Sequence, residues 1–340
     1  MTALHTVLIV DDEPAVRDLM ARWVTALGLQ PTTAASADEA LVTLRTQPCE
    51  LAIIDVMLPG RDGLWLAGEL RRDHPQTAVI IATAYTELLG RDGDPRPIAD
   101  LLVKPFQRDR FVLAVDRGRR WRQQTLDDWA WHARLALELE VRTEQICAAI
   151  DRVHGSAGDE SAALLAMTNE QAPDVAAHSA RVARYAASVA REMGCFEGAL
   201  AGVLEPAARF HDIGKLAIPV SLLTKPSQLS PGEAVIVRKH VEAGAEILAS
   251  TRTLQHLAPL VLASHEWFGG GGYPRQIAGS AIPLASRIVA IADAYDAMTQ
   301  DRYYRGRLDS AEAALELRRC CPSQFDPDIA TAFLGVLGRH

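Results

Sequence analysis

The stretch VLIVDDEP, residues 7–14, places two aspartates directly after four apolar residues. An apolar run of this length that ends in a turn signal is typical of a strand buried on both faces. Comparable runs lie at 30–34 (a weaker one), 51–55, 78–82 and 101–103. Amphipathic helical patterns separate them, as at Ala15–Leu27 and Ala37–Thr46. The alternation predicts an α/β doubly wound parallel sheet over residues 1–120.

Four of the predicted strands, all but the weaker one at 30–34, end in or are followed by polar residues that can carry chemistry. These residues are Asp11, Asp12, Asp55, Thr83 and Lys104. Because ligands gather outside the carboxyl ends of parallel strands, we expect the five side chains at one edge of the sheet. Three carboxylates in one place call for a hard cation such as Mg²⁺. A carboxylate held beside Mg²⁺, a lysine and a hydroxyl is suited to accept a phosphoryl group.

The motifs VDDEP, DVMLPGRDG, ATA and VKPF make residues 5–120 resemble the flavodoxin-like (CheY-like) receiver domain of two-component response regulators. The resemblance implies Asp55 as phosphoacceptor, with Asp11, Asp12 and Asp55 as the Mg²⁺ site. It implies Thr83 as the switch hydroxyl, Lys104 as the contact to the phosphoryl group, and a cognate sensor histidine kinase as partner.

Two features depart from the receiver pattern. Leu101 stands where the family usually has Tyr or Phe, three residues before the lysine. The segment expected to form the fourth helix, residues 86–100, contains two glycines and two prolines, which disfavour a regular helix. We expect this face to be short or mobile and the switch to be altered. An ordered helix over Glu87–Pro97 would contradict that hypothesis.

Residues 111–165 contain few turn signals and much Arg, Glu, Leu and Ala, which predicts one long helix interrupted near 154–161. We interpret residues 121–165 as a helical linker, either a plain spacer or a helix that dimerises the chain and transmits a signal. The amphipathic helical patterns of residues 166–340 predict an all-α domain. Its amphipathic windows are Ala176–Met193, Ala234–Ser250, Pro283–Thr299 and Ser310–Arg319.

Histidines and carboxylates recur through the helical domain at spacings that suit metal ions. Asp174 and His178 are four residues apart, so they share a helix face, and His211 is followed directly by Asp212. Lys215 comes one helical turn after His211. The other candidates are His240, His265 and Asp293. This thiolate-free set suits Fe, Mn or Zn, and a pair of such ions can clamp both reacting oxygens of a phosphodiester.

The motifs HDIGK, GGGGYP and ADAYDAMTQDRYYR make residues 165–335 resemble the HD-GYP subgroup of the HD-superfamily phosphohydrolases, which hydrolyse cyclic di-GMP. The resemblance implies metal ligands at Asp174, His178, His211, Asp212, His240, His265 and Asp293. It implies catalytic roles for His211, Asp212 and Lys215. It also implies that the dinucleotide is held by Gly270, Gly272, Tyr273, Arg302 and Arg305.

Three departures from the HD-GYP pattern bear on the metals. Ser264 replaces a usual histidine beside His265, Gly269 replaces an aspartate, and Asp174 is shorter than the usual glutamate. We therefore expect two divalent ions, Fe or Mn with Zn or Ni as alternatives, and at most partial occupancy of a third site.

Bulk properties exclude several other classes of protein. The net charge of −8 and pI near 5.7 disfavour binding to nucleic acid, and no apolar run approaches the length of a membrane span. The N-terminus lacks a signal-peptide pattern, and the five cysteines show no C-x-x-C spacing, which fits a reducing cytoplasm.

The leading interpretation is a cyclic di-GMP phosphodiesterase controlled by phosphorylation and acting as a homodimer. One alternative is a non-catalytic or weakly active receptor for a cyclic dinucleotide or a protein partner, because Ser264 replaces a ligand. The second is a hydrolase of another cyclic or phosphorylated nucleotide.

Overall fold

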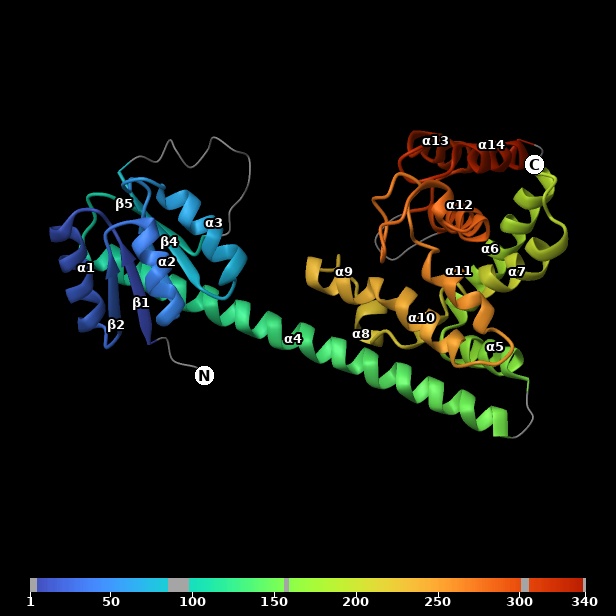
Figure 1. Cartoon of the computed structure of the whole chain (residues 1–340), viewed down its shortest axis with the longest axis horizontal. Coiled ribbons are helices and arrows are strands. Elements are labelled where there is room, and N and C mark those ends of the chain that lie inside the picture. The colour runs from blue at the N-terminus through green and yellow to red at the C-terminus, as the bar shows by residue number, and fades with distance from the viewer. Residues whose placement is uncertain (1–4, 85–97, 156–158, 301–305, 339–340) are drawn as a thin grey trace. The chain divides into compact units, whose positions relative to one another are not determined.

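The computed structural model of the chain describes residues 5–84, 98–155, 159–300 and 306–338. The chain divides into two compact units, Met1–Trp131 and His132–His340 (Figure 1). The hypothesis about Glu87–Pro97 falls on residues outside the described ranges.

The first unit contains the predicted parallel sheet, with strand order β2-β1-β3-β4-β5. The strands are β1 Thr6–Val10, β2 Gln30–Ala34, β3 Leu51–Asp55, β4 Ala78–Thr83 and β5 Asp100–Val103. Every residue of β3 and β4 is buried. The predicted doubly wound sheet is confirmed, including the weaker strand at 30–34.

Helices cover both faces of this sheet. They are α1 Pro14–Ala26, α2 Ala37–Thr46, α3 Gly63–Asp73 and the start of α4 Arg108–Gly155. The residues of α1 and α4 pack with Ile9, Ile53 and Ile80, whereas those of α2 and α3 pack with Leu8 and Ile54. Alternate residues of β1, β3 and β4 thus pack against opposite helix layers, so the polar side chains of these strands lie at the strand ends.

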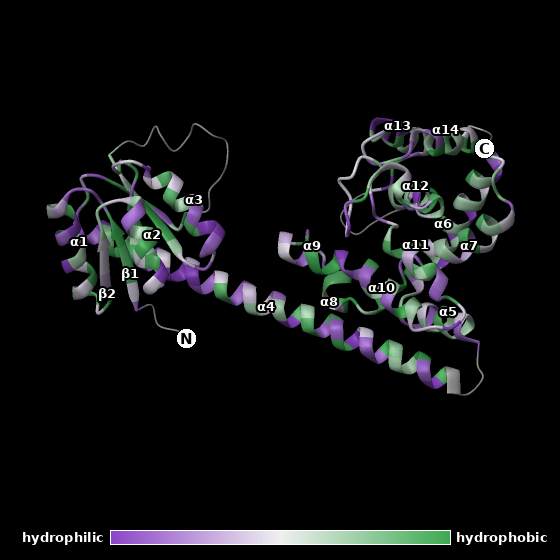
Figure 2. Ribbon diagram, viewed as in Figure 1, coloured by the Kyte–Doolittle hydropathy of each residue, from purple (hydrophilic) through white to green (hydrophobic). Residues whose placement is uncertain are grey.

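Helix α4 is the long helix that the sequence predicts, and it ends where the interruption was expected. The division between the two units falls within it. Phe111 and Val115 near its start belong to a core of the first unit, and Leu135 and Ile150 further along belong to a core of the second. Hydrophilic and hydrophobic residues alternate along its length (Figure 2).

In the described part of the second unit every regular element is helical. The longer helices are α5 Glu160–Gln171, α6 Pro173–Glu192, α7 Gly198–Phe210, α9 Pro231–Arg238, α10 His240–Ala249, α12 Leu284–Thr299, α13 Ser310–Arg319 and α14 Pro327–Leu337. The shorter ones are η2 Ile213–Leu216, α8 Val220–Leu223, η3 Gln255–Leu257, α11 Ala258–Leu262 and η4 Gly279–Ala281.

The predicted window Ala234–Ser250 is two helices rather than one, because the helix is interrupted at Lys239. The backbone of η2 packs against this break. A Cβ atom on Gly214 would lie 1.9 Å from the carbonyl oxygen of His240, so only glycine fits. The break therefore brings the HDIGK segment against the first turn of α10.

Candidate functional site

Five segments of the second unit bring histidines and carboxylates into one largely buried cluster. His178 lies on α6 and Asp293 on α12. His211 and Asp212 lie between α7 and η2, His240 begins α10, and His265 follows α11. Two groups form, each with all ligand atoms within 4.8 Å of one another. They are His178, His211 and Asp212, and Asp212, His240 and His265.

Asp212 belongs to both groups, and its two carboxylate oxygens face different histidines. Oδ2 lies 3.4 Å from Nε2 of His211 and 3.6 Å from Nε2 of His178. Oδ1 lies 3.2 Å from Nε2 of His240, which in turn lies 3.1 Å from Nε2 of His265. A carboxylate placed this way can bridge two cations.

Asp293 joins the cluster beside the first group. Its Oδ1 lies 3.0 Å from Nε2 of His178 and 3.9 Å from Nε2 of His211. Although burial opposes ionisation, the hydrogen bond from His178 and the charges of nearby histidines hold the pKa of Asp293 well below its usual range. Asp293 is thus available as an anionic ligand.

Three of the histidines are oriented by partners at the opposite ring nitrogen. Nδ1 of His211 donates to the carbonyl oxygen of Ala208, and Nδ1 of His240 donates to that of Val237, both at 2.8 Å. Nδ1 of His178 donates to the carboxylate of Asp296 at 2.7 Å. Such partners orient each ring so that Nε2 faces the cluster, where a metal could bind it.

Asp296 contacts this cluster but is not among the site residues that the sequence predicts. Its side chain is fully buried and accepts hydrogen bonds from Nε and Nη2 of Arg181 at 2.7 and 2.8 Å. It lies three residues after Asp293 on the same helix. The spacing in DAYD could have indicated Asp296, because it places both carboxylates on one face of α12.

The electrostatics of the cluster follow from burial and the close carboxylates. Burial opposes the charged form of His178, but hydrogen bonds to Asp293 and Asp296 raise its pKa to about 9. Burial and the neighbouring His240 lower the pKa of His265 to about 3. Burial opposes the ionisation of Asp212, but the charges of Lys215 and His211 hold the pKa of Asp212 well below its usual range.

Two buried atoms support metal binding at this cluster. Nε2 of His211 and Oδ1 of Asp212 have no hydrogen-bond partner among the described residues. An unpaired buried polar atom is costly, so two of them facing one cluster indicate a ligand that completes their coordination. Nitrogen and oxygen donors without thiolate fit borderline divalent cations.

Lys215 and Asp174 are placed differently relative to the cluster. Nζ of Lys215 makes a short ion pair with Oδ2 of Asp212. Asp174 lies in the first turn of α6, is exposed and belongs to neither ligand group. Within the described residues, the two groups therefore form without Asp174.

Close packing within the loop explains part of the glycine run. A Cβ atom on Gly272 would lie 2.2 Å from the backbone nitrogen of Trp267, so this glycine packs against its own loop. Gly270 has a positive φ of 86°. The amide of Tyr273 donates to the carbonyl oxygen of His265 at 3.1 Å. These contacts hold the loop closed beside His265.

The ring of Tyr273 stacks on that of His265, with centroids 5.1 Å apart and an interplanar angle of 6°. The loop therefore places the tyrosine directly beside the second ligand group. Arg302 and Arg305, the other predicted contacts to the dinucleotide, lie outside the described residues.

Ser264 is buried, and its hydroxyl donates to the carbonyl oxygen of Val261 at 2.8 Å. The hydroxyl proton thus closes the last turn of α11. Both ligand groups form from other residues.

The first unit brings the predicted phosphoacceptor site together at the edge of the sheet. Ligand atoms of Asp11, Asp12 and Asp55 lie within 4.8 Å of one another. Nζ of Lys104 lies 2.6 Å from a carboxylate oxygen of Asp11 and 2.6 Å from one of Asp55. Thr83, the last residue of β4, is fully buried. Three carboxylates with one lysine leave negative charge for a cation.

Asp100, the residue before Leu101, binds the start of α4. Its carboxylate pairs with Arg110 at 2.6 Å and with Arg117 at 3.1 Å. Although its burial opposes ionisation, Arg110 lowers the pKa of Asp100. The strand that carries Lys104 is thereby tied to the long helix.

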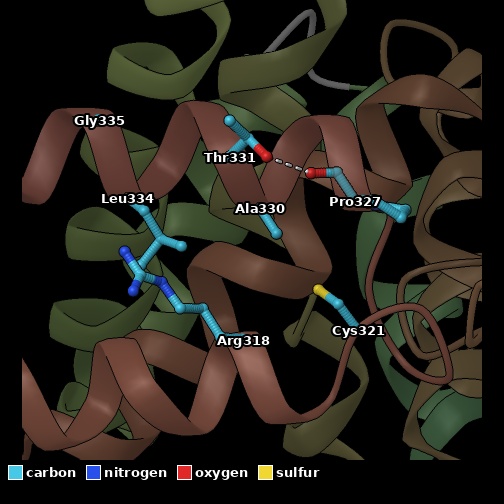
Figure 3. A pocket seen from close by; sticks show the side chains of 7 residues that line it. All are labelled: Arg318, Cys321, Pro327, Ala330, Thr331, Leu334 and Gly335. Carbon is cyan, nitrogen blue, oxygen red and sulfur yellow. Dashed lines mark hydrogen bonds between the residues drawn. The ribbon is translucent and has the colours of Figure 1, made fainter.

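A separate surface pocket lies between α13 and α14 (Figure 3). Arg318, Cys321, Pro327 and Leu334 contribute to its lining. None of its lining residues belongs to the three ligand groups.

Among the described helices, none combines the length and apolar character that crossing a membrane requires.

Comparisons with known proteins agree with this architecture. The sequence matches the response regulator receiver domain over residues 7–116 and the HD domain over residues 162–329. It is 29% identical over 334 residues to a cyclic di-GMP phosphodiesterase of Thermotoga maritima, covering 97% of this chain and 89% of that protein.

Two further relatives differ in how much of the chain they match. The cyclic di-GMP phosphodiesterase response regulator RpfG of Xanthomonas campestris is 30% identical over 337 residues, covering 96% of this chain and 86% of that protein. A 3'3'-cGAMP-specific phosphodiesterase 2 of Vibrio cholerae is 38% identical over 163 residues, covering 47% of this chain and 31% of that protein. The chain belongs to the family of response regulators that join an N-terminal receiver domain to a C-terminal HD-GYP phosphodiesterase domain.

Proposed function

We propose that this chain is a two-component response regulator in which phosphorylation of Asp55 controls a metal-dependent phosphodiesterase acting on cyclic di-GMP. The observation that carries the enzyme proposal is Asp212, whose two oxygens face separate histidine pairs. The names of the full-length relatives support cyclic di-GMP as the substrate.

We propose that two divalent ions, Fe or Mn first, occupy the two ligand groups, with Asp212 shared and Asp293 beside the first. When bound, such a pair supplies positive charge for the attacking and leaving oxygens of the phosphodiester. A third ion at Asp174 receives no support from the exposed position of that side chain.

Around the metals, side chains of this chain orient the ligands and the substrate. Asp296 and two backbone carbonyls hold three imidazoles with Nε2 toward the cluster. Lys215 neutralises Asp212 and lies where it can contact a phosphate oxygen. Tyr273 closes the site beside His265, on which its ring stacks.

The test is hydrolysis of cyclic di-GMP by anaerobically purified protein, with its metal content measured and Fe or Mn restored. We expect turnover that is lost with a chelator and lost in Asp212→Ala, which should retain fewer ions than His265→Ala. Tight binding of cyclic di-GMP without turnover under any of these metals would favour the receptor alternative. Faster hydrolysis of 3'3'-cGAMP would favour another nucleotide as substrate.

Control by phosphorylation is proposed to act through α4, which contributes residues to a core of each unit. The partners are a sensor histidine kinase and a second copy of the chain, dimerised through the exposed apolar residues of α4. Leu137 (60% exposed) and Val141 (42% exposed) are two of these. Activity and oligomeric state should respond to a phosphodonor in wild type and not in Asp55→Asn. Equal behaviour of the two proteins would contradict this coupling.

A further inference from the structure

Arg238 carries an exposed positive charge at the edge of the metal cluster. It is the last residue of α9, two positions before the ligand His240. Its guanidinium carbon lies 5.3 Å from the centre of the Tyr273 ring. Because that ring stacks on His265, the guanidinium lies one aromatic ring away from a ligand of the second group.

Two other cationic side chains at the cluster, both among the described residues, are already paired with carboxylates. Lys215 pairs with Asp212, and Arg181 pairs with Asp296. Among the described residues, Arg238 pairs with no carboxylate, and its guanidinium lies over the ring of Tyr273. Its guanidinium donors are therefore available to an incoming anion.

A cyclic dinucleotide presents two phosphodiesters to its binding site. One must lie at the metal ligands to be cleaved, so the other keeps its negative charge outside them. A guanidinium suits this second phosphate because its planar donors match two phosphate oxygens. The aromatic face holds the long arginine side chain in one place and so reduces the entropy lost on binding.

We propose that Arg238 binds the uncleaved phosphodiester of the cyclic dinucleotide and so selects substrates that carry two phosphates. This inference rests on the proposed function. It makes Arg238 a specificity-determining residue that contacts the substrate without contacting the reacting atoms.

The test compares Arg238→Gln and Arg238→Lys with wild type on two substrates. Cyclic di-GMP has two phosphodiesters, whereas bis(4-nitrophenyl) phosphate has one. For Arg238→Gln we expect KM for cyclic di-GMP to rise about tenfold or more, the usual effect of losing a charged hydrogen bond. Its kcat should change little, because the contact is equal in the ground and transition states. Arg238→Lys should fall between, and hydrolysis of bis(4-nitrophenyl) phosphate should be unchanged.

Arg191→Gln is the matched control, because Arg191 is another exposed arginine over an aromatic ring, Phe196, at 4.7 Å. It lies thirteen residues after His178 on α6, about 20 Å along the helix. We expect wild-type constants on both substrates. An unchanged KM in Arg238→Gln, or an equal loss on both substrates, would overturn the inference.

Equilibrium binding of cyclic di-GMP to each variant separates the inference from the proposed function. A wild type that binds without hydrolysing contradicts the proposed function, and the Kd of Arg238→Gln then decides the inference. About tenfold weaker binding supports it, and equal binding overturns it. A wild type that does not bind cyclic di-GMP overturns both.

Discussion

Nδ1 of His178 and the carboxylate of Asp296 lie 2.7 Å apart, and this hydrogen bond orients the imidazole whose Nε2 faces Asp212 and Asp293. Arg181 holds the same carboxylate through two further hydrogen bonds. The chain Arg181–Asp296–His178 thus extends from the cluster into the packed interface of α6 and α12.

Asp296→Asn should weaken metal binding at the first ligand group without unfolding the domain. The amide keeps the size of the side chain but loses the charge that supports the donor role of Nδ1. Loss of such a partner typically costs 10- to 100-fold in metal affinity, so we expect about that decrease. Competition with a chromophoric chelator measures it, with circular dichroism to verify the fold.

Asp326→Asn is the control for that variant. Asp326 is also a buried carboxylate of the second unit paired with an arginine, Arg287, and it caps the start of α14. Asp326 contacts no ligand histidine, so the substitution Asp326→Asn should lower stability and leave metal affinity unchanged. Equal metal affinity in both variants would contradict the positioning role of Asp296.

Ser264→Ala should preserve the metal content and the activity. The serine hydroxyl donates to the carbonyl oxygen of Val261, so its loss removes a buried hydrogen bond. We expect the free energy of unfolding to fall by about 1 kcal/mol. Urea denaturation and metal analysis of the purified variant measure the two quantities. A variant that loses bound metal would show that Ser264 takes part in coordination.

The receiver half of the molecule was largely predictable from local sequence. Buried parallel strands leave a strong apolar pattern, and their carboxyl ends meet at one edge, so Asp11, Asp55 and Lys104 had to converge. The metal cluster of the helical half was different. The sequence pattern places His178 and Asp293 on separate helices. Only the family resemblance predicted that they share a site, and in the structure they lie 3.0 Å apart.

Other features could not be deduced because they depend on the tertiary path of the chain. The need for Gly272 comes from the backbone of Trp267, which approaches it only after the loop folds back. The break at Lys239 accompanies the close packing of Gly214 on His240, and no proline or glycine marks it. The spacing of Asp296 from Asp293 places both on one face of α12, but only the structure shows that Asp296 accepts a hydrogen bond from His178.

Asp12→Asn should have opposite effects on stability with and without Mg²⁺. Asp12 is the exposed member of the group with Asp11 and Asp55, so without a cation its charge repels theirs. The variant should then unfold at the same temperature as wild type or slightly higher. With millimolar Mg²⁺, wild type should gain stability by mass action while the variant gains less.

Thermal denaturation of the full chain over a series of MgCl₂ concentrations measures this crossing. Asp38→Asn is a suitable control, because Asp38 is an exposed aspartate of α2 outside the group. It should respond to Mg²⁺ as wild type does. Equal Mg²⁺ stabilisation in Asp12→Asn would contradict a role for Asp12 in cation binding.

Glu233→Gln should destabilise the second unit in a way that depends on pH. Glu233 forms the capping box of α9, accepting from the amide of Ser230 at 2.7 Å and pairing with Lys225. Burial opposes its charge, but Lys225 and the Ser230 amide lower its pKa from 4.5 to about 2. Because the folded pKa lies below the unfolded one, its stabilisation is complete above about pH 4.5 and is lost as the pH falls towards 2.

At pH 7 we expect Glu233→Gln to lower the free energy of unfolding by about 1–2 kcal/mol. Urea denaturation at steps from pH 7 to pH 3 should show this difference shrinking once the pH falls below about 4.5. Glu246→Gln, at an exposed position of α10, should show no such pH dependence. A difference for Glu233→Gln that is as large at pH 3 as at pH 7 would show that shape, rather than the charge held by Lys225, accounts for its contribution.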